Sequence, residues 1–271
     1  IGQTSILKSI SLQLNAGEIV GLAGESGSGK SMTAMAVLGL LPPKANVSGT
    51  VTLEDTMLSG ASENDLCAIR GRDIGIIFQE PMTALNPVMT IGDQIAETVR
   101  IHRKVSRADA RKIAREMLDR VGLRAPQFGL GRYPHNLSGG QRQRVAIAIA
   151  LALKPKLIIA DEPTTALDVT TQAEILDLLN RLVREDGASM ILVTHDLAVV
   201  AQVADRVVLM KHGEIVDEGS VDHVFRNSNN PYTVKLIINT DHRPERTEQG
   251  SRSGEPVLQV KQLVREYPGR R

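Results

Sequence analysis

Eight consecutive residues fit the phosphate-binding pattern G-x-x-x-x-G-K-[ST], namely Gly24, Glu25, Ser26, Gly27, Ser28, Gly29, Lys30 and Ser31. Glycines let successive backbone N–H groups point at an anion, and a helix that starts after the loop adds its positive end. Lys30 would reach the outer phosphates, and the Ser31 hydroxyl would hold Mg²⁺. The pattern predicts binding of a nucleoside triphosphate, and the alternative is a glycine-rich turn that only caps a helix.

Two carboxylates follow a second apolar run. Residues 157–160 predict a buried strand that ends at Asp161 and Glu162, and open α/β sheets carry their ligands at that end of their strands. Asp161 is placed to hold the Mg²⁺ shell, and Glu162 to polarise the water that attacks a terminal phosphate. Taken alone, two acids after a strand are more typical of a solvated loop.

A second anion site is predicted at the start of a later helix. Its residues follow Leu137 and are Ser138, Gly139, Gly140 and Gln141. They supply a hydroxyl, flexible N–H groups and a positive helix end. One phosphate loop already serves one nucleotide, so this second site predicts a head-to-tail dimer in which it acts on a partner's nucleotide. The alternative is a serine N-cap whose glycines ease the turn.

The elements that must position these motifs indicate an α/β fold. Continuous apolar runs predict buried strands at 18–23, 73–78, 157–160 and 190–194. A helix is expected from Met32 to Leu41, ended by Pro42 and Pro43, and further helices over 139–153, over 170–185 and from Asp196. Helical spacing dominates residues 88–152, with Ser106 as an N-cap and Gly122 as a stop. Alternating segments at 11–14 and 47–54 predict half-buried strands, and a hairpin is expected around His212 and Gly213.

Composition limits the possible partners. The chain has 271 residues, of which 42% are hydrophobic, and its 32 basic residues nearly balance 31 acidic ones. No broad positive field therefore favours nucleic acid. The single cysteine, Cys67, cannot form an intrachain disulfide, and the longest apolar stretch, residues 145–153, is too short to span a bilayer.

The C-terminal part of the chain differs in composition from the part before it. Residues 239–256 are charged and polar without a periodic apolar face, which is typical of a linker. Residues 257–271 begin a new strand-like pattern, which we interpret as the truncated start of a second domain. An unrelated C-terminal extension is the alternative.

The order of these motifs resembles that of an ABC-transporter ATPase over residues 1–238. The resemblance implies a P-loop NTPase (RecA-like) core, an antiparallel β subdomain and an inserted α-helical subdomain at about 88–152. It implies ATP as ligand at residues 24–31, Met32, 138–141 and Asp168, and Mg²⁺ at Ser31, Gln79 and Asp161. Lys30, Gln79, Glu162 and His195 would be the catalytic residues.

The same resemblance implies particular partners. They are a second ABC domain, transmembrane permease subunits on the cytoplasmic face of the cell inner membrane and, indirectly, a periplasmic substrate-binding protein. Residues 78–87 and the run Asn230, Pro231, Tyr232 and Thr233 resemble the di- and oligopeptide importer branch. Tyr267 would stack on adenine in the second half of a tandem-fused ATPase. The alternative function is a non-transport ABC ATPase acting on DNA or ribosomes, and the absence of a long heptad insertion between Lys30 and Ser138 weighs against it.

Overall fold

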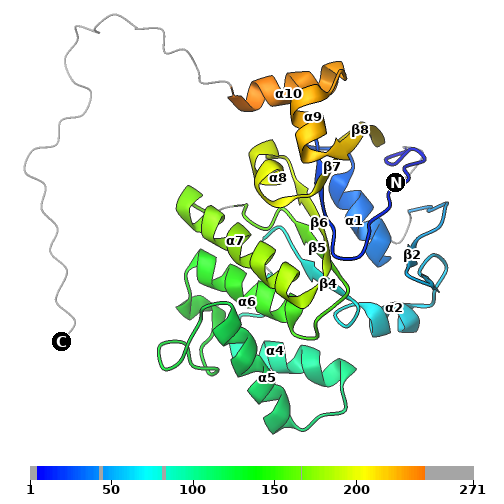
Figure 1. Ribbon diagram of the computed structural model, residues 1–271. Coiled ribbons are helices and arrows are strands. Elements are labelled where there is room, and N and C mark those ends of the chain that lie inside the picture. The colour runs from blue at the N-terminus through cyan, green and yellow to red at the C-terminus, as the bar shows by residue number, and fades with distance from the viewer. Residues whose placement is uncertain (1–4, 43–44, 81–83, 166, 242–271) are drawn as a thin grey trace, which may run out of the picture. The chain divides into compact units, whose positions relative to one another are not determined.

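The structure is a computed structural model that describes residues 5–42, 45–80, 84–165 and 167–241 (Figure 1). Within these residues a six-stranded sheet runs through the centre, in the order β4-β5-β6-β1-β7-β8. The strands are β1 (Ile19–Ala23), β4 (Ile74–Ile77), β5 (Leu157–Asp161), β6 (Ser189–Thr194), β7 (Arg206–Lys211) and β8 (Glu214–Ser220). The first five strands of that order are parallel, and β8 is antiparallel to β7.

The strands at the centre of the sheet are buried on both faces. Every residue of β1, β5 and β6 is buried, as expected for parallel strands that helices cover on both sides. β1 lies between β6 and β7, with Ile19 opposite Met190 and Val20 opposite Arg206. The continuous apolar runs of the sequence correctly predicted these strands.

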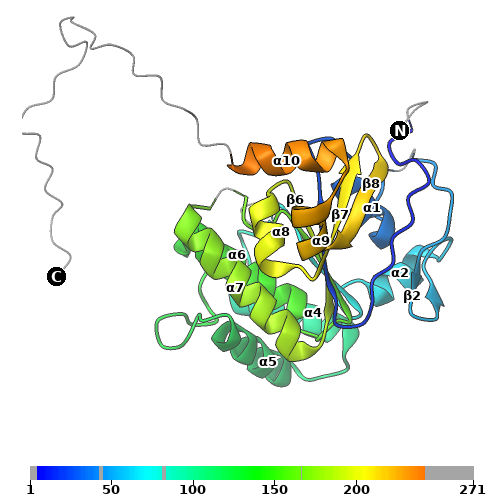
Figure 2. The same cartoon turned by 45° about the horizontal axis from the view of Figure 1, so that its top comes forward.

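Helices cover the two faces of the sheet. They are α1 (Lys30–Leu38), α2 (Glu63–Ile69), α4 (Ile91–His102), α5 (Arg107–Arg120), α6 (Gly139–Leu151), α7 (Val169–Asp186), α8 (Leu197–Val203), α9 (Val221–Asn227) and α10 (Pro231–Asp241), with a 3₁₀ turn at Pro134–Asn136. Both views place α1 on the side of the sheet away from α6 and α7 (Figures 1 and 2). Neighbouring residues of β1 therefore point to opposite faces of the sheet. Val20 packs in a hydrophobic cluster with α1, and Ile19 packs in a cluster with α6 and α7.

Residues 91–151 are largely helical, in agreement with the sequence pattern. Side chains of Thr90, Ser106 and Ser138 cap the N-termini of α4, α5 and α6. Gly122 adopts a positive φ of 82° just beyond α5, which is the conformation that ends helices. The apolar residues Ile95, Val99 and Leu118 are fully buried where α4 and α5 join the large core cluster.

Three sequence-based expectations were wrong in detail. Residues 11–14 form no strand, and of 47–54 only β2 (Thr52–Leu53) pairs, with β3 (Thr56–Met57). Leu12 and Leu14 nevertheless pack against the core, so the alternation records burial of one face without a paired backbone. The helix expected to reach Leu41 ends at Leu38, because Gly39 takes φ 65° and donates its N–H to the last turn.

Two C-terminal helices were not predicted. α9 and α10 lie beside β7 and β8 in both views, and α10 extends to Asp241, past the expected domain end at residue 238 (Figures 1 and 2). The rest of the expected linker and the segment 257–271 with Tyr267 lie outside the described residues, as does Pro43. No helix among the described residues combines the length and apolar character needed to cross a membrane.

Candidate functional site

The predicted site residues lie at the carboxyl ends of four adjacent parallel strands. Lys30 and Ser31 come after β1, Gln79 follows β4, Glu162 follows β5 and His195 follows β6. These strands are neighbours in the order β4-β5-β6-β1, so their ends meet at one edge of the sheet. Ligands of open α/β sheets bind at that edge.

The loop of residues 24–31 joins β1 to α1 and has the backbone that its glycines permit. Gly29 is the N-cap of α1 with φ 106°, a conformation that side chains disfavour. Gly24 has φ 146°, and a Cβ there would lie 2.2 Å from the Met210 carbonyl oxygen. Ser28 is buried in the loop, whereas Glu25, Ser26 and Gly27 are exposed and Met32 is half-buried on α1. The loop therefore presents its tip and the first turn of α1 to a ligand.

Lys30 is folded back onto this loop. Its side chain is buried, and Nζ donates hydrogen bonds to the carbonyl oxygens of Gly24 and Glu25, both at 2.9 Å. Burial lowers the pKa of the Lys30 ammonium, while the negative charges of Glu162 and Asp161 act in the opposite direction. An anion placed in the loop would meet a partly desolvated cation, which strengthens their attraction.

Ser31 and Asp161 form an oxygen pair. The Ser31 Oγ donates to Asp161 Oδ1 at 3.0 Å, and burial raises the pKa of Asp161 while this hydrogen bond opposes the rise. A hydroxyl and a carboxylate are the hard oxygen donors that Mg²⁺ takes beside phosphates and water. The described residues hold no cluster of three or more His, Cys, Asp or Glu side chains suited to a metal. The residues present fit a Mg²⁺ ion whose remaining ligands come from nucleotide and water.

Glu162 is the centre of a side-chain network. Its Oε2 accepts hydrogen bonds from Gln79 Nε2 at 3.0 Å and from Thr165 Oγ1 at 2.9 Å, and its Oε1 lies 3.0 Å from His195 Nδ1. Glu162 has a positive φ of 46°, which is uncommon for a residue with a side chain. Gln79 and His195 therefore both contact the carboxylate of Glu162, so three predicted catalytic residues that follow separate strands lie together.

The network also sets the charge of that carboxylate. Burial alone would raise the pKa of Glu162, but hydrogen bonds from His195 and Thr165 and the charge of Lys30 lower it below its usual value. Sequence analysis gave Thr165 no part in this. Only the structure reveals the bond from Thr165 to Glu162.

The second predicted anion site forms a capping box. Ser138 Oγ accepts the N–H of Gln141 at 3.3 Å, and Gln141 Oε1 accepts the N–H of Ser138 at 3.0 Å. A Cβ on Gly140 would lie 2.5 Å from Thr171 Cγ2, so close packing against α7 explains that glycine. Within the described residues, no hydrogen bond joins 138–141 to the phosphate loop.

Asp168 has a structural role at the start of α7. Its Oδ1 accepts the Thr171 N–H at 3.0 Å, and its Oδ2 accepts the Thr171 hydroxyl at 2.7 Å. These bonds to Thr171 lower the pKa of the Asp168 carboxyl. The residue is therefore held as an ionised helix cap.

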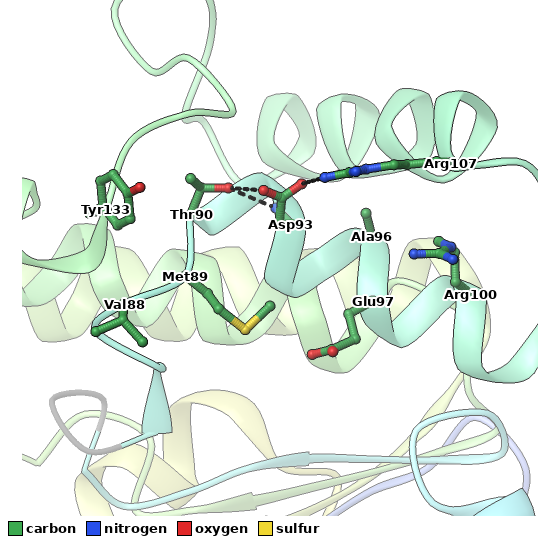
Figure 3. A pocket seen from close by; sticks show the side chains of 9 residues that line it. All are labelled: Val88, Met89, Thr90, Asp93, Ala96, Glu97, Arg100, Arg107 and Tyr133. Atoms are coloured by element: carbon green, nitrogen blue, oxygen red, sulfur yellow. Dashed lines mark hydrogen bonds and ion pairs between the residues drawn. The ribbon is translucent and has the colours of Figure 1, made fainter.

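A hollow of about 300 Å³ lies on the helical region (Figure 3). It is lined by Val88, Met89, Thr90, Asp93, Ala96, Glu97, Arg100, Arg107 and Tyr133. Val88 is 80% exposed and Tyr133 38% exposed, while Asp93 is paired with Arg107 and Arg111. The hollow thus combines exposed apolar groups with charges of both signs.

The fold and the motif order define a class of protein. A model of the ABC transporter family matches residues 7–165, and the chain belongs to that family. Among solved structures, a dimeric ATP-binding cassette in a post-hydrolysis state bound to ADP and phosphate is similar, with a TM-score of 0.71 and 35% identity, over 82% of this chain and 94% of that one. The predicted ABC-transporter ATPase and its P-loop fold are confirmed.

More closely related proteins come from bacteria. The chain is 48% identical over 262 residues to a Brucella melitensis protein named for peptide import and ATP binding, and the match covers 94% of this chain and 77% of that protein. It is 48% identical over 230 residues to the oligopeptide transport ATP-binding protein AppD of Bacillus subtilis, over 84% and 70% of the two chains. A 50% identical match to OppD of Mycobacterium bovis spans 85% of this chain but 38% of OppD.

Proposed function

We propose that this chain is the ATP-hydrolysing subunit of an ABC importer for peptides or related small solutes. The convergence of Lys30, Ser31, Asp161 and Glu162 at one sheet edge carries the proposal. The names of the similar proteins, which refer to peptide import and oligopeptide transport, supply the substrate class.

The phosphate loop binds the triphosphate of ATP. Backbone N–H groups of the loop and of the first turn of α1 point at the phosphates, and Lys30 leaves its carbonyl partners to contact the outer phosphates. Ser31 and Asp161 would hold Mg²⁺, and the bound ion would supply positive charge beside the phosphates. Both side chains are already within 3.0 Å of each other, so little rearrangement is needed.

Glu162 accepts a proton from the attacking water. The lowered pKa keeps its carboxyl ionised, and His195 and Gln79 hold the side chain in one orientation. Such a positioned base contributes about 10²- to 10⁴-fold to a rate. His195 is exposed, with 63% of its side chain accessible, so it can contact the terminal phosphate.

A second ABC domain completes the site. Because one phosphate loop already serves the nucleotide of this chain, Ser138, Gly139, Gly140 and Gln141 would serve a nucleotide bound to the opposite domain. Asp168 and Thr165 lie at the same interface. A similar solved structure is a dimeric cassette, which supports pairing of two such domains.

The hollow lined by Val88 and Tyr133 receives the permease. Val88 comes shortly after Gln79 in the sequence, and Gln79 donates a hydrogen bond to Glu162, so binding of the permease at the hollow would be coupled to the Glu162 network. The subunit would lie peripherally on the cytoplasmic face of the inner membrane, and a periplasmic binding protein would deliver the solute to the permease.

The test is ATP hydrolysis by the complex with its permease. Co-expression with its permease subunits should give a membrane complex whose ATPase activity rises when peptide and binding protein are added. Co-purification with DNA or ribosomes instead of permease subunits would contradict the importer function.

A further inference from the structure

The run Asn230, Pro231, Tyr232 and Thr233 connects the C-terminal helices to the phosphate loop. The Tyr232 hydroxyl accepts the backbone N–H of Glu25 at 3.2 Å and donates to the Met210 carbonyl oxygen at 3.4 Å. Glu25 is the second residue of the phosphate loop and lies 207 positions from Tyr232. A single phenol thus joins the start of the loop to the end of β7.

The ring of Tyr232 is held in place. The side chain is buried, and Lys211 Nζ lies 4.6 Å from the ring centroid, within the range of a cation–π contact. Burial raises the pKa of the Tyr232 phenol, so the hydroxyl keeps its proton and can both accept and donate.

The neighbours of Tyr232 fix the helix that carries it. Asn230 Oδ1 accepts the N–H of Tyr232 at 2.9 Å, and Asn230 Nδ2 donates to the Val216 carbonyl oxygen of β8 at 2.7 Å. The hydroxyl of Thr233 donates to Asp217, also on β8. Pro231 is the first residue of α10, and the fixed φ of proline suits the start of a helix. Each residue of the run therefore contributes to the placement of the Tyr232 hydroxyl.

The Met210 carbonyl oxygen, to which the Tyr232 hydroxyl donates, also lies against the phosphate loop. Gly24, the first residue of the phosphate loop, lies so close to that oxygen that a Cβ would approach it to 2.2 Å. Tyr232 binds the same oxygen and also the N–H of Glu25. The first turn of the loop is consequently fixed between β7 and the phenol.

We propose that Tyr232 is a positioning residue that orders the first turn of the phosphate loop and thereby raises the affinity for ATP. The inference rests on the proposed function, because it assumes that residues 24–31 bind the triphosphate. A loop that is ordered before binding loses less conformational freedom when the ligand arrives. The Glu25 N–H is engaged by the phenol, so the effect on ATP passes through the loop backbone.

The experiment is Tyr232→Phe in the full chain, with ATP affinity measured by calorimetry and KM and kcat measured by phosphate release. This change keeps the ring and removes only the hydroxyl. Loss of its hydrogen bonds should weaken ATP binding and raise KM by about threefold to tenfold. The kcat should stay within about twofold, because no reacting atom loses a contact.

A matched control separates positioning from general stability. Ser189 also accepts one backbone N–H, from Gly17 at 2.9 Å, and donates to one carbonyl, that of Asn15 at 3.1 Å. It lies at the opposite ends of the strands from the phosphate loop, because β6 begins there. Ser189→Ala should lower the melting temperature and leave the ATP affinity unchanged.

The outcomes distinguish the two proposals. If wild type binds ATP, Lys30→Ala does not, and Tyr232→Phe binds as wild type does, the role of Tyr232 is refuted while the proposed function stands. An equal loss of affinity in Tyr232→Phe and Ser189→Ala would also refute it, since instability would explain both. If wild type itself binds no ATP, the proposed function fails first.

Discussion

His195 Nδ1 lies 3.0 Å from Glu162 Oε1, and the two residues directly follow strands β6 and β5, which pair in parallel. The contact follows from the sheet register, because that register brings the two strand ends together. Gln79 and Thr165 occupy the other carboxylate oxygen. The orientation of the Glu162 side chain is therefore set by the fold. Replacement of this residue tests whether its carboxylate acts as the base in ATP hydrolysis.

Replacement of Glu162 with Gln should reduce kcat for ATP hydrolysis by about 10²- to 10⁴-fold, because the base is lost. ATP binding should persist, since Glu162 affects Lys30 through its charge and makes no hydrogen bond to the loop among the described residues. Phosphate release and calorimetry measure the two quantities. Glu116→Gln, an exposed carboxylate on α5, is the control and should behave as wild type. Normal turnover by Glu162→Gln would remove the assigned role.

Replacement of Lys30 with Ala should instead abolish measurable ATP binding. The ammonium lies against the phosphate loop and is buried, so its attraction for an anion in the loop is only weakly screened by water. Calorimetric titration with ATP is the measurement. Unchanged affinity would show that the loop binds no triphosphate through this residue.

Ser138→Ala should impair hydrolysis at the composite site and cost about 1 kcal/mol of stability through loss of the α6 cap. Ser106 supplies the matched control, because it caps α5 in the same way through the N–H of Asp109 at 3.1 Å. Ser106→Ala should show a similar shift in urea denaturation with normal ATPase activity. Equal activity losses in both variants would assign Ser138 to helix capping alone.

Val88→Asp should reduce retention of the permease during purification of the complex. Val88 is 80% exposed, so the change should alter the free energy of unfolding by less than about 0.5 kcal/mol. Val47, which is 62% exposed and does not line the hollow, provides the control as Val47→Asp. Full retention of the permease by Val88→Asp would place the docking surface elsewhere.

Asp205 should make stability depend on pH. It accepts hydrogen bonds from Arg184 at 2.7 Å and from the Ile19 N–H at 2.8 Å. Burial alone would raise the pKa of Asp205, but these bonds lower it below its usual value. A carboxyl whose pKa is lower in the folded state stabilises above its unfolded pKa, about 3.9, and loses that contribution as pH falls through the folded pKa.

Asp205→Asn should therefore lower the free energy of unfolding more at about pH 7 than at about pH 3, as measured by urea denaturation. Asp222, an exposed acid on α9 with 86% of its side chain accessible, provides the control as Asp222→Asn. An identical difference from wild type at both pH values would contradict the assignment.

The sequence correctly predicted those strands and helix starts that depend on local sequence patterns. Continuous apolar runs located β1, β5 and β6, and serine caps located the starts of α5 and α6, because both signals lie within a few residues. The missing strand at 11–14 shows the limit of such patterns, since alternation reports burial and cannot report whether a backbone partner exists.

Contacts across long separations were beyond sequence reasoning. The motif order identified Glu162, His195 and Gln79, but their meeting at one carboxylate depends on the strand order. The Tyr232 bond to Glu25 gave no signal in the sequence, because no periodicity relates residues so far apart in the chain. Only the placement of α10 beside β7 reveals it.

The position of β1 in the sheet has a consequence for biosynthesis. β1 pairs only with β6 and β7 among the described strands, and these begin at Ser189 and Arg206. The strand that leads into the phosphate loop therefore leaves the ribosome well before either of its neighbours. Pairing of such distant segments is slow, so the nascent chain exposes an apolar strand until both neighbours are made and is a natural client for chaperones.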